Sequence, residues 1–195
     1  MPNIYCAVDT ETTGLNIDKD VIHELAIIPL DSRFVPLGSP FVTRIKPGDG
    51  DWESPYTLEI RKSQDIGFEP EIAIQAFYTW FDKMGFGVDA KGRPNRIIPI
   101  GHNYLAFDMP FLIKLFGKAD YEAHFHYKPI DTLQIAEYIN MNRLYNQREA
   151  YFKNTKLQTI AGVLGVTPLV AHIAQEDCHT TAAVLQRLLA ADILV

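Results

Sequence analysis

Three stretches with the composition of β-strands follow one another within the first 47 residues. Residues 3–9 and 21–30 are apolar runs rich in β-branched side chains, and residues 41–47 alternate apolar with polar side chains. Gly14 and Asn16 mark a turn between the first two runs. Apolar runs of this length are typical of buried strands, whereas alternation is typical of a strand with one exposed face. Because the connections are short, we expect an antiparallel three-stranded meander.

The rest of the chain alternates helical patterns with shorter strands. Pro70 begins a helix that we expect to end near Met84, before Gly85. Residues 47–69 are expected to form a long connection with one short helix near 58–62. The further elements are strands at 96–100 and 127–131 and helices at 108–117, 132–142, 157–164 and 176–191. This order predicts an α/β fold in which helices flank a mixed β-sheet.

The bulk properties favour one compact domain. No Gly/Ser-rich or Pro-rich linker divides the 195 residues, so we expect residues 1–195 to form a single domain. No stretch approaches the about 18 apolar residues of a membrane helix, and the N-terminus lacks the pattern of a signal peptide. A cytoplasmic protein without a membrane partner is therefore expected. Cys6 and Cys178 are too few for a disulfide framework, and we expect both to pack in the interior.

The net charge of −6 limits the partners of the chain. Proteins that bind nucleic acid duplexes without sequence preference usually carry an excess of Lys and Arg. The acidity therefore argues against a large duplex-binding surface. A short single strand fits better, especially if divalent cations neutralise some of the carboxylates.

Asp9 and Glu11 stand at the end of the first apolar run, in the sequence Asp-Thr-Glu-Thr-Thr-Gly. Side chains two residues apart on a strand point to the same face. Two such carboxylates raise each other's pKa unless a cation lies between them, and their hard oxygen atoms favour Mg²⁺ or Mn²⁺ over zinc. Two alternatives remain: a solvent-exposed strand end, and a phosphatase motif in which Asp9 is the nucleophile.

Asp108 follows the sequence Gly101-His-Asn and stands at the start of an expected helix. It is a candidate third metal ligand, and the alternative is a helix N-cap. His172 and Asp177 are five residues apart, which on one helix would separate them by about 140°. We therefore expect His172 to precede the helix and to act as general base, while Asp177 binds metal. The alternative is a packed or surface residue, which is the more common role of an isolated histidine.

Polar and aromatic residues beside these acids are candidate substrate contacts. Hydroxyl groups and backbone amides next to a metal carboxylate can bind sugar or phosphate, and aromatic rings can stack on bases. Basic and aromatic residues also interleave from Arg143 to Lys156, where they either follow a single strand or form a solvated face. The candidate contacts near the acids are Thr10, Thr12, Thr13, Gly14, Leu15, His102, Asn103 and Phe107.

Three motifs together resemble a known family. They are Asp9-Thr-Glu-Thr-Thr-Gly-Leu15, His102-Asn-Tyr-Leu-Ala-Phe-Asp108 and His172-Ile-Ala-Gln-Glu-Asp177. The chain resembles the DEDDh 3′–5′ exonucleases of the DnaQ-like superfamily, which includes polymerase proofreading subunits, oligoribonuclease and ribonuclease T.

The resemblance implies a ribonuclease-H-like fold and two Mg²⁺ or Mn²⁺ ions held by four carboxylates, with Asp9 bridging both ions. It also implies that His172 deprotonates the attacking water and that nucleoside 5′-monophosphates leave the 3′ end of single-stranded DNA or RNA. The implied metal ligands are Asp9, Glu11, Asp108 and Asp177.

Two features depart from the family pattern. Residues 47–68 lack the His-Gly-Ile segment of many members, and the chain ends close to its last helix, without a tail of the kind that docks on a polymerase. We therefore expect a free-standing nuclease, although polymerase association stays possible. The alternatives are a binding module without turnover on the same fold and the phosphatase built on Asp9.

Overall fold

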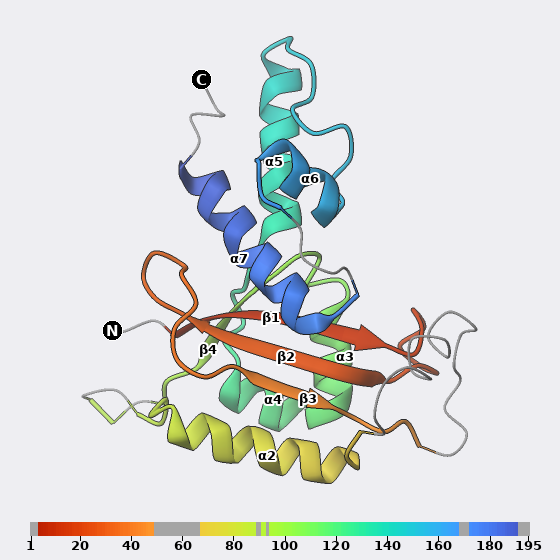
Figure 1. Ribbon diagram of the computed structural model, residues 1–195, viewed down its shortest axis with the longest axis vertical. Coiled ribbons are helices and arrows are strands. Elements are labelled where there is room, and N and C mark those ends of the chain that lie inside the picture. The colour runs from red at the N-terminus through yellow and green to blue at the C-terminus, as the bar shows by residue number, and fades with distance from the viewer. Residues whose placement is uncertain (1–3, 49–66, 89–90, 93, 168–171, 191–195) are drawn as a thin grey trace.

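The computed structural model describes residues 4–48, 67–88, 91–92, 94–167 and 172–190. Its centre is a five-stranded mixed sheet with the strand order β3-β2-β1-β4-β5 (Figure 1). The strands are β1 (Ile4–Thr12), β2 (Ile22–Leu30), β3 (Phe41–Arg44), β4 (Ile97–Gly101) and β5 (Ile130–Asp131).

The first three strands form the antiparallel meander that the sequence predicts, because β2 pairs antiparallel with both β1 and β3. β4 and β5 then add to the sheet in parallel with β1. The pairing of β4 with β1 covers only Ile4–Ala7, whereas β1 continues to Thr12. The last part of β1 therefore extends beyond the end of its parallel neighbour.

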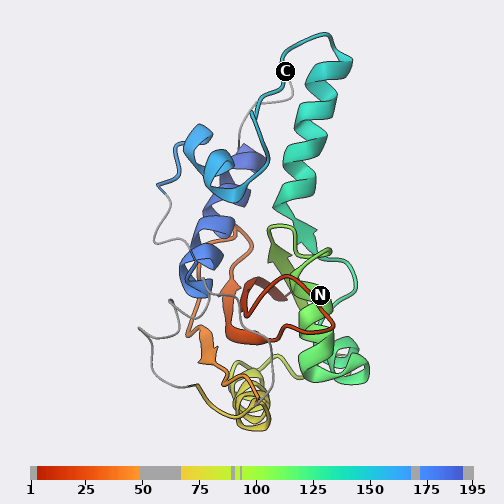
Figure 2. The same cartoon turned by 90° about the vertical axis from the view of Figure 1, so that its right-hand side faces the viewer.

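Helices cover both faces of the sheet. α7 crosses one face, and α2, α3 and α4 lie on the other, while α5 and α6 stand beyond one edge (Figures 1 and 2). The predicted mixed α/β fold is confirmed. The helices are α2 (Pro70–Lys83), α3 (Asp108–Phe116), α4 (Lys118–His124), α5 (Thr132–Tyr145), α6 (Leu157–Val163) and α7 (Ala174–Ala190).

The larger core lies under α2, α3 and α4 and is built around aromatic rings. Phe77 of α2 is fully buried, and its ring centroid lies 4.9 Å from that of Phe116 and 5.7 Å from that of Phe125. Burial of aromatic side chains contributes a large part of the hydrophobic stabilisation of a domain. This core packs against one face of the sheet, and α7 packs against the opposite face.

Small side chains allow α7 to approach the other face closely. Ala7 and Ala26 are fully buried beneath the helix, together with Ala174, Cys178 and Ala182 from α7 itself. The Cys178 thiol lies 3.5 Å from the Ala26 carbonyl oxygen. Cys178, like Cys6, is a buried free thiol, as expected from the sequence.

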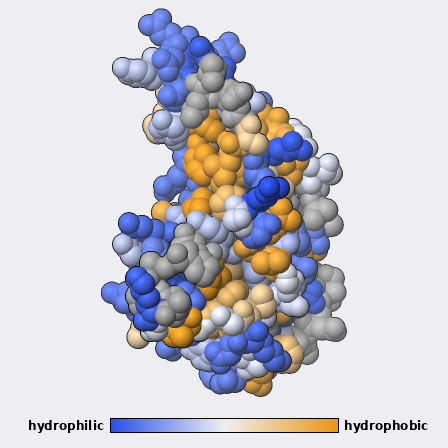
Figure 3. All heavy atoms as spheres, turned by 90° about the vertical axis from the view of Figure 1, so that its left-hand side faces the viewer, coloured by the Kyte–Doolittle hydropathy of each residue, from blue (hydrophilic) through white to orange (hydrophobic). Residues whose placement is uncertain are grey.

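The α5–α6 region packs on the second half of α7 and forms a third apolar cluster. Phe152, Ile160 and Leu188 belong to this cluster and are buried. The end of this region farthest from the sheet is hydrophilic, and apolar side chains gather between it and the sheet (Figure 3). The region therefore packs on the domain through its lower part and exposes its tip.

Several boundaries differ from the sequence expectation. β3 and β5 are shorter than residues 41–47 and 127–131, and α5 continues to Tyr145 rather than ending near 142. α4 was not expected, because Tyr121 is its only buried residue and seven residues hold too little periodicity. The helix proposed near 58–62 lies outside the described residues.

None of the helices that the structure describes is long and apolar enough to span a bilayer.

The close approach of α7 leads to a stability prediction. Replacing Ala26 by Leu forces extra volume between β2 and α7, and overpacking of this kind costs about 1–3 kcal/mol. We expect a correspondingly lower midpoint of urea unfolding for Ala26→Leu. Val42, the pairing partner of Ala26 on β3, is 41% exposed, so Val42→Leu should change stability by less than about 0.5 kcal/mol. Equal effects of the two substitutions would show that the α7 contact is not tight.

Candidate active site

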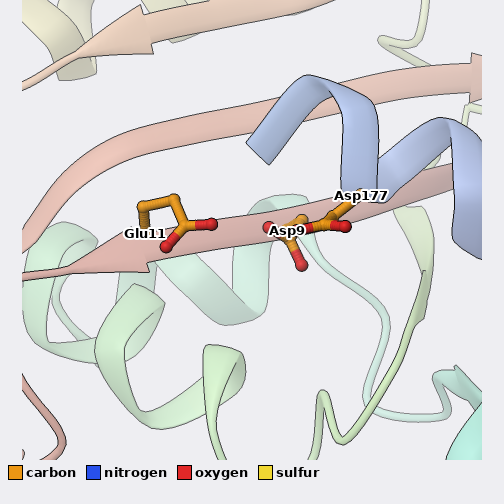
Figure 4. Close-up of side chains that lie close together, drawn as sticks. All are labelled: Asp9, Glu11 and Asp177. Atoms are coloured by element: carbon orange, nitrogen blue, oxygen red, sulfur yellow. The ribbon is translucent and has the colours of Figure 1, made fainter. Parts of the chain in front are cut away.

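Three carboxylates that are far apart in the sequence meet at the interface of β1 and α7. One ligand oxygen each from Asp9, Glu11 and Asp177 lies within 4.8 Å of the other two. Asp9 and Glu11 project from β1, and Asp177 reaches them from the first part of α7 (Figure 4). The alternation of side chains along a strand accounts for the shared direction of Asp9 and Glu11.

Asp108 reaches the site from α3, at the edge of β1 that β4 leaves uncovered. Its Oδ1 accepts hydrogen bonds from the Thr10 backbone N–H (2.9 Å) and from the Thr10 hydroxyl (2.8 Å). The Asp108 carboxylate thus accepts the Thr10 N–H where a neighbouring strand would otherwise supply a carbonyl oxygen. Asp108 is buried at position one of α3, and no side-chain cap bond is present, so it is not the N-cap. It lies outside the three-carboxylate cluster but lines the same cavity.

His172 precedes α7, as its spacing from Asp177 predicts. Its backbone lies in the left-handed region with φ 64°, which costs an L-residue about 1–2 kcal/mol. The conformation directs the His172 backbone N–H to Asp177 Oδ2, at 3.1 Å. This bond ties the histidine to the helix start and also orients the Asp177 carboxylate. The His172 side chain is exposed and lines the same cavity as the acids.

The carboxylates of the site lie close to one another, and both burial and mutual repulsion raise the pKa values of Asp9 and Glu11. Burial, together with repulsion from the carboxylates of Asp177 and Glu24, raises the pKa of Glu11 to about 8. Burial, followed by repulsion from Asp108 and Glu11, raises the pKa of Asp9 well above its usual range. Burial also raises the pKa of Asp108 to about 7, although the two hydrogen bonds from Thr10 oppose this shift.

These carboxylates fit a divalent metal. Among the described residues that line the cavity there is no lysine or arginine, so no side-chain cation of this kind balances the acids. Clustered carboxylate oxygens are the ligands that Mg²⁺ and Mn²⁺ prefer, and a cation would remove the repulsion that raises the pKa values. The solvent-exposed strand end considered for Asp9 and Glu11 does not describe this cluster.

A cavity of about 710 Å³ opens over the acids, which is within the range of small-ligand sites. Leu15 is 85% exposed at its rim. Phe107 also lines it, and its ring packs against Phe111. The candidate substrate contacts that line this cavity are Thr10, Thr12, Gly14, Leu15, His102 and Phe107.

Two candidate contacts lie elsewhere. The structure places Thr13 in the interior, 1% exposed, where its hydroxyl accepts the Val21 N–H at 3.0 Å and holds the turn after β1. Asn103 lines a neighbouring cavity instead. Thr10 lines the first cavity, but its hydroxyl is occupied by Asp108. The Thr12 hydroxyl likewise donates to the Gly14 carbonyl oxygen at 2.6 Å, so threonine hydroxyls help to hold the connection between β1 and β2.

Residues that the motifs do not include hold the site in place. Glu24 of β2 is 2% exposed, and its Oε1 accepts the Ala174 N–H at the start of α7 (3.0 Å), while Arg44 Nε lies 3.4 Å from its Oε2. Asp131 accepts the Asn103 N–H (2.9 Å) and so orders the loop that carries His102. A single acid inside the apolar run 21–30 was the available signal for Glu24, since a buried charge requires a partner.

The residues between Arg143 and Lys156 do not form one continuous surface. Phe152 is 1% exposed and belongs to the apolar cluster of the α5–α6 region. The Arg143 guanidinium lies over the Tyr151 ring, 5.4 Å from its centroid, and Arg143 Nε donates to the Glu149 carbonyl oxygen. Part of the basic and aromatic pattern therefore has a structural role, whereas Lys156 is exposed.

The solved structures most similar to the chain include several of exonuclease I. An exonuclease I structure superposes with a TM-score of 0.70 at 20% identity, covering 97% of this chain and 41% of that chain. The zinc-bound complex of E. coli exonuclease I with single-stranded DNA gives a TM-score of 0.71 at 20% identity, covering 98% and 42%. A complex of E. coli exonuclease I with a dT13 oligonucleotide gives 0.69 at 20% identity, covering 94% and 40%.

The chain thus spans about two fifths of the length of these exonuclease I chains. At 20% identity the likeness establishes the fold. No curated protein shows significant sequence similarity to the chain. A family model described as exonuclease, RNase T, matches residues 6–185, which include all three motifs. The chain therefore belongs to the RNase T family of exonucleases, the superfamily that its motifs predict.

Proposed function

We propose that the protein is a metal-dependent 3′–5′ exonuclease that releases nucleoside 5′-monophosphates from single-stranded nucleic acid. The observation that carries the proposal is the convergence of Asp9, Glu11 and Asp177 within 4.8 Å in an open cavity that Asp108 and His172 also line. The structural neighbours add support, because exonuclease I forms complexes with single-stranded oligonucleotides. Single-stranded DNA is accordingly the first substrate to test, with RNA beside it.

In this proposal the four carboxylates of Asp9, Glu11, Asp108 and Asp177 hold two Mg²⁺ or Mn²⁺ ions. When bound, such ions stabilise the negative charge that develops at phosphorus and on the leaving oxygen. Thr10 holds the Asp108 carboxylate in place, and His172 N–H holds that of Asp177. Preorganisation of this kind avoids rearrangement during the reaction.

His172 acts as the general base of the reaction. A ring nitrogen of its neutral imidazole accepts a proton from a water molecule that attacks the phosphorus of the 3′-terminal nucleotide. The bond from phosphorus to the 3′ oxygen of the preceding nucleotide breaks, and that oxygen leaves with a proton. The exposed position of His172 before α7 gives the imidazole access both to water and to the acids. The products are a nucleoside 5′-monophosphate and a strand shortened by one nucleotide.

The substitution Asp9→Asn tests the role of the carboxylate cluster. We expect exonuclease activity on a 5′-labelled single strand to fall by at least about 10³-fold, because the proposed metal site loses the carboxylate of Asp9. In EDTA the same variant should unfold at a temperature about 2–4 °C higher than the wild type, since an amide avoids the free-energy cost of burying an ionisable carboxyl group among other acids. Thermal unfolding and gel analysis of the products measure both effects. A variant that stays active would contradict the proposal, and tight oligonucleotide binding by a wild type without hydrolysis would favour the binding module.

The general base is tested by His172→Ala. Loss of a general base lowers kcat by about 10²–10⁴-fold, with a smaller effect on KM. The matched control is His126→Ala, which removes a histidine that is not among the cavity-lining residues and should leave kcat within about twofold. Steady-state kinetics on a labelled oligonucleotide provide the measurement. Equal kcat values for the two variants would remove His172 from the mechanism.

The raised pKa values lead to a pH prediction for the metal-free protein. Glu11 with a pKa of about 8 and Asp108 with a pKa of about 7 hold protons in the folded state that the unfolded chain releases near pH 4. Because the folded state binds more protons, these two groups stabilise the fold less as the pH rises from about 4 to 8. We expect a Glu11→Gln variant in EDTA to gain stability over the wild type as the pH increases.

Added metal should reverse this dependence. A bound Mg²⁺ or Mn²⁺ replaces the protons, so the rise in Tm on adding metal should grow between pH 5.5 and 8.5. Scanning calorimetry with EDTA, Mg²⁺ or Mn²⁺ compares the conditions. A metal effect on Tm that does not vary with pH would show that the titrating acids are not the ligands.

A further inference from the structure

The acids lie where two cavities meet. The first is the cavity of about 710 Å³, whose lining includes Gly14, Leu15 and Phe107. The second has about 480 Å³, and Asp9, His102 and Asp177 line both. A phosphate group at the carboxylates therefore has space on two sides. Residues that line only the second cavity include Asn103, Asn154, Thr155, Lys156 and Gln158.

We propose that the second cavity binds the nucleic acid strand on the 5′ side of the scissile bond, and that the Lys156 ammonium contacts a phosphodiester there. This inference rests on the proposed function and specifies how that site takes its substrate. It distinguishes a site that grips a strand from one that recognises only the terminal nucleotide.

The charges around the two cavities support this assignment. Lys156 is the one lysine or arginine among the described residues that line either cavity. Its side chain is exposed, and its ammonium forms no ion pair within the described part of the chain. An unpaired cation beside a group of acids does little for the fold, whereas it can form a charge-assisted contact with a phosphate.

The wall that carries Lys156 is held firmly. Asn140 of α5 exchanges two hydrogen bonds with the Phe152 backbone, at 3.0 and 2.9 Å. The Thr155 hydroxyl donates to Glu137 at 2.7 Å, and Asn154 Oδ1 accepts the Lys156 N–H at 3.2 Å. Ordering these groups before the substrate arrives lowers the entropic cost of binding.

The chemistry of the reaction decides which end of the strand takes which cavity. A 3′ exonuclease breaks the bond to the 3′ oxygen of the upstream nucleotide, so the strand must continue on the leaving-group side of the phosphate. The first cavity offers Leu15 and Phe107, which suit the base of a terminal nucleotide. The second cavity offers a cation and amide groups, which suit a backbone that carries charge but little sequence information.

The surroundings of Lys156 continue the favourable charge. Residues 132–167 contain four basic residues, two lysines and two arginines, and two acidic residues. The whole chain has 18 lysines and arginines against 24 acidic residues. Lys153 and Arg148 of this region are exposed. The segment that carries Lys156 is therefore basic within an acidic chain, and a polyanion beside it meets less repulsion.

Two substrates separate this inference from the proposed function. The p-nitrophenyl ester of thymidine 5′-phosphate carries a scissile bond but no upstream nucleotide, while a 5′-labelled dT10 strand carries both. We expect Lys156→Ala to raise KM for dT10 about tenfold and to leave KM for the ester nearly unchanged. A change of about tenfold is the effect of one lost contact to a charged group. The salt dependence of KM for dT10 should weaken by about 0.7 in logarithmic slope.

Two further variants complete the kinetic test. Lys156→Arg should retain most of the dT10 affinity, because the charge is kept. Lys118→Ala is the matched control: it removes an exposed lysine of α4 whose ion pair is with Glu122 on the surface, and it should leave both KM values within twofold. Equal changes of KM for the ester and for dT10 in Lys156→Ala, or no change in either, would overturn the inference while leaving the proposed function intact.

Binding without turnover provides an independent readout. In the Asp9→Asn background with Mg²⁺, fluorescence anisotropy of labelled dT10 should show an about tenfold weaker Kd when Lys156 is also replaced by Ala. An unchanged Kd overturns the assignment of the second cavity. Should the wild type cleave neither the ester nor dT10 in Mg²⁺ or Mn²⁺, the proposed function itself fails, and the anisotropy experiment still decides whether a strand occupies this cavity.

Discussion

The extension of β1 beyond the end of β4 is the constraint on which the site depends. From Val8 to Thr12 the strand has a neighbour on one side in β2, while the other edge lacks the parallel partner that covers Ile4–Ala7. Asp108 satisfies the Thr10 N–H at that edge. Asp9 and Glu11, the residues before and after Thr10 in the strand, have side chains that point toward α7. A strand that ended together with β4 would have neither the open edge for Asp108 nor the projecting pair.

Holding like charges together requires an anchor that resists their repulsion. Glu24 provides one, because its carboxylate accepts the first N–H of α7 and also lies beside Arg44 on β3. The small side chains of Ala7 and Ala26 provide another, since they let α7 rest directly on the sheet. The helix that carries Asp177 is therefore fixed both at its start and along its length. The repulsion within the site is offset by packing outside it, an arrangement common at functional sites.

The sequence predicts those parts of this arrangement that depend on local pattern. The meander follows from two apolar runs and an alternating stretch close together in the sequence, and the placement of His172 before α7 follows from helical geometry. The positions of Asp108 and Asp177 at helix starts are local too. The functions of Glu24 and Asp131 are not local, because their partners are set by tertiary packing: Glu24 and Ala174 are 150 residues apart. The threonine hydroxyls of the first motif, which are candidate substrate contacts, also form hydrogen bonds within the protein, and these bonds could not be read from the sequence.

An acidic chain can still suit a polyanionic substrate if its charges are distributed unevenly. The negative net charge repels nucleic acid at long range, but salt screens exposed charges beyond about 8–10 Å. At short range only the groups that line the cavities matter. There, clustered carboxylates provide a place for divalent cations, and Lys156 adds a positive charge within the second cavity. In the proposed function, a strand end that fits between the two cavities would be selected by shape and by local charge rather than by overall attraction.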